Sequence, residues 1–168
     1  MQKPGQGPGT KIVDAFRRNS GPERRPKGTL QIQVIEKATG TVVQEHTFRN
    51  IVVNNAKTQM AHLLGGDTTN RFVNRMQFGT GTTAEAVADI ALETPITPVK
   101  AAAAATETPD VYSVQFTAQL TTAEANGFPI TEAGLLFGNN TLCARKVFGA
   151  LNKTSDFVFQ FTWTISWS

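Results

Sequence analysis

The segment from residue 157 to residue 167 alternates strictly between bulky apolar side chains and mostly small polar ones. The bulky set is Phe157, Phe159, Phe161, Trp163, Ile165 and Trp167, and the other set is Val158, Gln160, Thr162, Thr164 and Ser166. Successive side chains of a β-strand point to opposite faces of its sheet. The alternation therefore predicts a long antiparallel strand with its bulky face buried against a second layer and its other face in water. We interpret the six bulky residues as structural.

Apolar patterns upstream predict further strands separated by turns. We expect a hairpin from residues 30–35 and 42–53, single strands at residues 71–78 and 111–120, and a second hairpin from residues 130–137 and 142–148. Helical spacing over residues 54–64 predicts one short helix, which ends at Gly65 and Gly66 because glycine can take the left-handed conformation. Six or seven strands and one short helix predict an all-β fold, an antiparallel β-sandwich over residues 29–168.

Residues 84–110 interrupt this pattern. They are rich in alanine and threonine and contain Pro95 and Pro98, which stop any helix that begins in the alanine-rich part. We interpret them as a long surface connection that contributes little to the core.

The first 28 residues form a separate segment, which we expect to be a disordered or extended N-terminal arm. They hold four of the eight prolines and five of the fourteen glycines, a density that prevents regular structure. One short stretch places Ile12, Val13 and Phe16 at helical spacing behind a Thr10 cap, which favours one or two helical turns on a partner. A disordered tail with a few apolar residues and a docking segment that folds on binding are equal alternatives.

The positive charge of the chain resides in this arm. Seven basic and two acidic residues give residues 1–28 a net charge of +5, while nine basic and eleven acidic residues give the other 140 residues −2. The pI of about 9.2 therefore describes the arm, and nucleic acid could be contacted only through it. A +5 peptide suits an acidic protein surface as well, and we favour a protein partner. The candidate docking residues are Lys11, Ile12, Val13, Phe16, Arg17, Arg18, Arg24 and Arg25.

Few residues offer catalytic or metal-binding chemistry. A single cysteine, Cys143, rules out an intramolecular disulfide and a cysteine-based zinc cluster. In a predicted strand it is expected to be a small buried residue rather than a nucleophile served by His62, and neither His46 nor His62 has metal-ligand spacing. We expect no enzymatic activity, no cofactor and no metal. No apolar stretch approaches the ~20 residues of a bilayer-spanning helix, so no membrane partner is expected.

Four short motifs follow one another between residues 50 and 167. The first is Asn50-Ile51-Val52-Val53-Asn54-Asn55-Ala56, and the second is Gly79-Thr80-Gly81-Thr82-Thr83-Ala84 followed by Asp89-Ile90-Ala91-Leu92-Glu93. The third is Ile130-Thr131-Glu132-Ala133-Gly134-Leu135-Leu136-Phe137. The fourth is Leu142-Cys143-Ala144-Arg145-Lys146-Val147-Phe148, followed by the alternating final strand. In this order and spacing, the chain resembles structural proteins of tailed bacteriophages.

The resemblance implies a small β-sandwich on the exterior of a virion, as part of a tail fibre or baseplate, a neck or collar, or a head decoration. It implies no catalytic residues and does not cover the arm. We therefore expect a virion protein, assembled in the host cytoplasm, that docks to other virion proteins through the arm and repeats as a homo-oligomer. Two alternatives are an icosahedral coat protein whose arm binds the genome, and a sugar-binding module of a host-recognition fibre that uses exposed tryptophans.

Glu132 and Gly134 of the third motif are also predicted to be structural. Glu132 is either a buried carboxylate that accepts backbone hydrogen bonds at the loop entering the hairpin, or an exposed turn residue. The sequence leaves these two interpretations equal.

Overall fold

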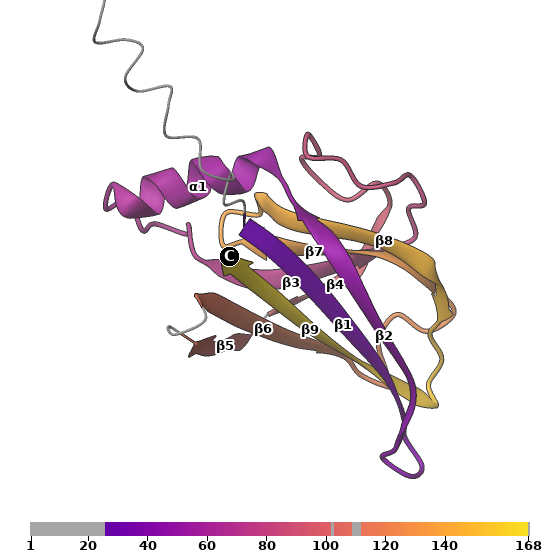
Figure 1. Cartoon of the computed structure of the whole chain (residues 1–168). Coiled ribbons are helices and arrows are strands. Elements are labelled where there is room, and N and C mark those ends of the chain that lie inside the picture. The colour runs from indigo at the N-terminus through magenta and orange to yellow at the C-terminus, as the bar shows by residue number, and fades with distance from the viewer. Residues whose placement is uncertain (1–25, 102, 109–111, 168) are drawn as a thin grey trace, which may run out of the picture.

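The computed structural model of the chain describes residues 26–101, 103–108 and 112–167 (Figure 1). The described residues form nine strands and one helix. The strands are β1 (Pro26–Glu36), β2 (Val42–Val52), β3 (Val73–Gly79), β4 (Pro95–Ala101), β5 (Ala103–Thr108), β6 (Ser113–Leu120), β7 (Pro129–Phe137), β8 (Leu142–Asn152) and β9 (Phe157–Trp167). The helix α1 spans Asn54–Leu64. The prediction of an antiparallel all-β fold with one short helix is confirmed, with more strands than the six or seven expected.

Neighbouring strands pair antiparallel in the order β4-β3-β7-β8-β2-β1-β9-β6-β5. The sheet curves over on itself, so that β2, β1, β9, β6 and β5 form one layer and β4, β3, β7 and β8 form the other (Figure 1). The two layers join where Ile51 and Val52 of β2 pair with Arg145 and Ala144 of β8. The result is a barrel-like β-sandwich.

Strand β9 lies at the centre of its layer, between β1 and β6. Phe159, Phe161, Trp163 and Ile165 are buried, which confirms the alternation expected for this strand. The two ends differ from the prediction: Phe157 is half-buried and the side chain of Trp167 is 39% exposed. The reason is position, because the facing layer covers the middle of the strand more completely than its ends.

The core lies between the two layers. The ring of Phe78 on β3 packs against that of Phe161 on β9, with 4.4 Å between their centroids. Trp163 is completely buried, and its indole Nε1 donates a hydrogen bond of 2.9 Å to Oδ1 of Asn50 on β2. A buried indole needs such an acceptor for its N–H group.

Helix α1 has the predicted bounds and follows β2 directly. Its backbone closes on Gly65, whose φ is −77°, while Gly66 takes the left-handed conformation with φ of +88°. The left-handed residue that ends the helix is therefore Gly66, one residue later than it would be if Gly65 had this conformation. Ala56 and Gln59 are the buried residues of the helix. Ala56 belongs to the hydrophobic core and Met60 packs against it, so α1 covers one end of the sandwich (Figure 1).

The prediction for residues 84–110 is wrong. The edge strands β4 and β5 lie within this range, and the loop before them buries Leu92. Edge strands accept proline because one side of their backbone has no partner strand, and Pro95 is the first residue of β4. Small alanine and threonine side chains give no apolar alternation by which such strands could be recognised.

Strand β1 begins at Pro26, inside the segment predicted to be the arm. Pro26, Lys27 and Gly28 pair with Trp167, Ser166 and Ile165 of β9, so the last three residues of the predicted arm belong to the sheet. The predicted docking residues Lys11, Ile12, Val13, Phe16, Arg17, Arg18, Arg24 and Arg25 lie outside the described residues.

Candidate functional site

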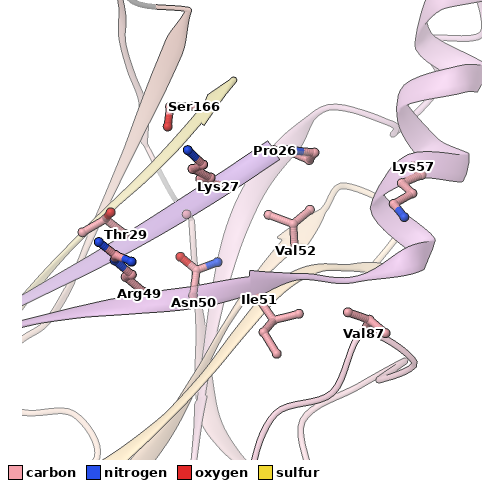
Figure 2. A pocket seen from close by; sticks show the side chains of 11 residues that line it. Pro26, Lys27, Thr29, Arg49, Asn50, Ile51, Val52, Lys57, Val87 and Ser166 are labelled. Carbon is pink, nitrogen blue, oxygen red and sulfur yellow. The ribbon is translucent and has the colours of Figure 1, made fainter. Parts of the chain in front are cut away.

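A groove opens where the arm joins the sandwich (Figure 2). It has a volume of about 520 Å³ and is lined by β1, β2, the start of α1 and the loop that carries Val87. Three basic residues contribute to its wall, namely Lys27 from β1, Arg49 from β2 and Lys57 from α1, and none of the lining residues is acidic. We call this surface the basic groove. Its charge suits an acidic or carbonyl-rich partner.

Asn50 lies within the wall of the basic groove and is fixed from two sides. Its Oδ1 accepts the hydrogen bond from Trp163. Gly28 on the neighbouring strand leaves the space that the amide fills, since a Cβ at residue 28 would lie 2.1 Å from Oδ1 of Asn50. The buried Nδ2 of Asn50 has no hydrogen-bond partner. Buried polar groups are normally hydrogen-bonded, so a ligand that brought an acceptor to Nδ2 would gain binding free energy from that contact.

A second polar cluster lies around Glu132, whose side chain is completely buried on β7. It faces the loop over residues 80–94, whereas the neighbouring Ala133 and Leu135 face the core between the layers. Its Oε1 accepts hydrogen bonds from the backbone amides of Gly81 (3.2 Å) and Thr94 (2.8 Å). Its Oε2 accepts from the amide of Glu93 (3.1 Å) and from Nε and Nη2 of Arg145 on β8 (3.0 and 2.8 Å). Of the two interpretations of Glu132, the structure therefore supports the buried carboxylate that accepts backbone hydrogen bonds.

Arg145 connects this carboxylate to the loop over residues 80–94. Its Nη1 donates to Oδ2 of Asp89 at 2.8 Å, and its Nη2 lies 3.8 Å from Oε2 of Glu93. Burial opposes ionisation of Asp89, but hydrogen bonds from the amide of Ala86 and from Arg145 outweigh it and hold the pKa of this carboxyl below its ordinary value. The pKa of Arg145 is raised despite burial, because Asp89 and Glu132 both accept its hydrogen bonds.

The same loop is held at two further points. The carboxylate of Glu93 accepts hydrogen bonds from the hydroxyl of Thr83 and the amides of Thr82 and Thr83, which lowers its pKa. Nζ of Lys146 donates to Oε1 of Glu85, and the amide of Val147 donates to Oε2. Burial tends to raise the pKa of Glu85, but these hydrogen bonds bring it below its usual value.

Glycines in the second and third motifs make room for this cluster. A Cβ at Gly79 would lie 2.4 Å from Oε1 of Glu132, and one at Gly81 would lie 2.6 Å from the same atom. A Cβ at Gly134 would lie 2.9 Å from Cδ2 of the buried Leu92. The absence of a side chain at these glycines thus lets Glu132 and Leu92 pack against the backbone.

Three of the four sequence motifs therefore meet in one place: the glycine-rich stretch with its acidic continuation, the Glu132 segment and the Arg145 segment. We call this set the carboxylate–arginine cluster. The oxygen atoms of Glu132 are already occupied by five donors, so the cluster organises a loop and leaves little for a ligand. Sequence reasoning missed the contribution of Arg145, although the antiparallel pairing of two adjacent predicted strands could have suggested it.

The cysteine and the two histidines are poorly placed for catalysis or metal binding. Cys143 is buried, and desolvation raises the pKa of its thiol to about 12, so the thiolate form is not accessible at neutral pH. His62 lies beside Asp67, with Nδ1 and Oδ2 3.8 Å apart, and His46 stacks on Phe48. Among the described residues, no group of three or more histidine, cysteine or acidic side chains is arranged to hold a metal ion. The described part of the chain also contains no helix with the length and apolar character needed to span a bilayer.

The two tryptophans of β9, which a sugar-binding site on this strand would use, differ in their exposure to solvent. Trp163 lies in the core with its indole N–H satisfied, and Trp167 is partly exposed at the end of the strand. At most Trp167 could stack on a sugar ring.

Comparison of the chain with protein-family models, with curated proteins and with solved structures found no match.

Proposed function

We propose that the protein is a non-enzymatic structural component of a tailed-phage virion, docking to neighbouring virion proteins through its N-terminal arm and repeated in a ring or lattice. The site on the particle is a tail, a baseplate, a neck or collar, or the exterior of the head. The motif pattern described above supports this class of protein, and in this chain three of its motifs meet in the carboxylate–arginine cluster.

The observation that carries the proposal is the grouping of interaction surfaces where the arm begins. The arm joins β1 at Pro26, and the basic groove opens beside it. Exposed apolar residues of α1, β9 and the neighbouring segments lie at the same end of the molecule (Figure 1). A rigid sandwich that presents one such end, extended by a basic arm, is suited to weak contacts that repetition around a symmetric assembly multiplies.

Mass spectrometry of purified particles from a culture that produces the protein tests its presence in the virion. The chain is expected among the particle proteins, and its absence would refute the proposal. Deletion of residues 1–25 then tests the arm and leaves β1 intact, because β1 begins at Pro26. The truncated protein is expected to remain folded and to lose binding to purified virion parts.

The same deletion distinguishes the coat-protein alternative. An icosahedral coat protein would still assemble after the deletion but would lose bound nucleic acid. A variant with Arg17, Arg18, Arg24 and Arg25 replaced by serine serves as a matched control. If it lost docking as completely as the deletion, docking would require the positive charge of the arm, and the apolar residues could not sustain it by themselves.

A further inference from the structure

An apolar groove lies between α1 and the ends of five strands, β3, β6, β7, β8 and β9. Its walls are formed by Met60 and Leu63 of α1, by Val73 of β3, and by Val114 of β6 and Ile165 of β9, among other residues that are all apolar. Its volume is about 300 Å³. We call this surface the apolar groove. It is separate from the basic groove, with which it shares no lining residue.

The rim of the apolar groove exposes large side chains. Phe72 and Trp167 line it and are 54% and 39% exposed. Tyr112 is 67% exposed, and its carbonyl accepts a hydrogen bond of 3.0 Å from the amide of Trp167. Clustered exposure of this kind marks an interaction site, whereas single exposed apolar residues are ordinary.

The start of the arm lies at this rim. Pro26, which lines the basic groove, is paired directly with Trp167 of the apolar groove, so the described chain begins between the two grooves. Nine residues separate Phe16 from Pro26, and an extended segment of that length spans up to about 30 Å. The arm has one compact apolar set, Ile12, Val13 and Phe16, with the spacing of a single helical face. Its length and its attachment point bring that set within reach of the apolar groove.

We propose that the apolar groove is the docking site for the segment of residues 12–16 of the same chain. A tether of this length holds the segment at an effective concentration of order millimolar, well above the concentration of a second copy in dilute solution. The free subunit therefore covers its most exposed apolar surface with its own arm. The segment must leave the groove before it can bind a neighbouring protein, which would delay docking until a partner competes for it.

Disulfide trapping in the full chain tests this assignment. Both cysteine pairs are made on a Cys143→Ala background, because Cys143 itself lines the groove. The variant Phe16→Cys/Leu63→Cys then places one thiol in the segment and one on the groove wall. Oxidation by diamide in dilute solution is expected to give an intrachain disulfide in the monomer. The matched control is Phe16→Cys/Val43→Cys, because Val43 is exposed in the hairpin at the opposite end of the molecule (Figure 1). The groove pair should cross-link about tenfold faster than the control pair, as expected for a locally concentrated thiol.

A second measurement uses no cysteine. Replacement of Ile12 and Phe16 by serine should expose the groove, shifting the emission of Trp167 to longer wavelength and increasing the binding of an apolar dye. Replacement of Arg17 and Arg18 by serine should leave both signals unchanged. Equal cross-linking of the two cysteine pairs, together with unchanged emission, would overturn the proposal. Disulfide-linked dimers as the main product would also overturn it, because the occupant would then be the arm of a second copy.

Discussion

The substitution Glu132→Gln examines the carboxylate–arginine cluster most directly. The glutamine has the same shape as the glutamate but replaces one acceptor oxygen by an NH₂ donor. In one orientation this NH₂ group faces the amide of Glu93 and two donors of Arg145, and in the other it faces the amides of Gly81 and Thr94. Either way, at least two buried N–H groups lose their acceptor and Arg145 loses its buried counter-charge.

The expected loss of stability follows from these contacts. Breaking a buried ion pair from one side costs about 3–5 kcal/mol, and the lower end of this range applies here because Arg145 keeps its ion pair with Asp89. For a domain of this size, that corresponds to a fall in Tm of roughly 10 °C. Urea unfolding followed by the fluorescence of the buried Trp163 measures the change. The control is Glu45→Gln, whose carboxylate lies on the surface and accepts a hydrogen bond from Gln33; this variant is expected to unfold like the parent protein.

A double variant separates the contribution of the ion pair to stability from that of the hydrogen bonds of the loop amides. In Glu132→Met/Arg145→Met both charges are absent, and such apolar replacement of a buried pair is often neutral by itself. Here the amides of Gly81, Glu93 and Thr94 still lose their acceptor, so the double variant should remain less stable than the parent by about 1–3 kcal/mol for each amide that stays buried. Hydrogen exchange at these three amides should accelerate. Parental stability and exchange in the double variant, or a change below about 1 kcal/mol in Glu132→Gln, would refute the anchoring role.

Three further predictions concern packing and charge. Gly79→Ala should destabilise the fold by about 1–3 kcal/mol in thermal unfolding because its Cβ would collide with Glu132, whereas Gly149→Ala, which meets no atom within 4 Å, should not. Trp163→Ala should cost about 3–5 kcal/mol in urea unfolding, and an unchanged midpoint would contradict its place in the core. Stability should be constant from neutral pH down to about the ordinary pKa values of Glu85 and Asp89, 4.5 and 3.8, and fall below them, because both pKa values are lowered in the folded protein and their contribution is lost on protonation. Replacing these two carboxyls by amides should make that acid limb shallower, since Glu93 and Glu124, whose pKa values are also lowered, still contribute. An unaltered limb would assign it to other groups.

The sequence predicted those elements whose signal is local. The alternation of β9 and the helical spacing of α1 are properties of eleven adjacent residues, and both elements have the expected bounds. Strands β4 and β5 were missed because their small side chains and prolines show no apolar period, and they become strands by pairing with β3 and β6. The role of Arg145 was missed for a related reason, since it depends on Asp89, 56 positions away in the sequence.

The surfaces at the arm end of the molecule were beyond sequence reasoning as well. Trp167 has the same place in the alternation as Trp163, and only the position of the facing layer makes one exposed and the other buried. The basic groove brings together Lys27, Arg49 and Lys57 from three elements, and no run of the sequence displays them as a group. The docking role of the arm residues stays a prediction.

The positions of the motifs allow their contribution to the fold to be distinguished from any contribution to function. Glu132 can be buried only if Arg145 and the loop amides satisfy it, and the amides can approach only because Gly79 and Gly81 have no side chain. A change in one motif therefore demands a change in another, so the motifs are expected to persist together in any chain that keeps this loop, whatever that chain binds. The residues that determine the partner must then lie outside the cluster. In this protein, the exposed basic side chains of the basic groove, the exposed rim of the apolar groove and the start of the arm at Pro26 meet that condition. Substitutions of these exposed residues should alter binding while leaving the unfolding free energy nearly unchanged.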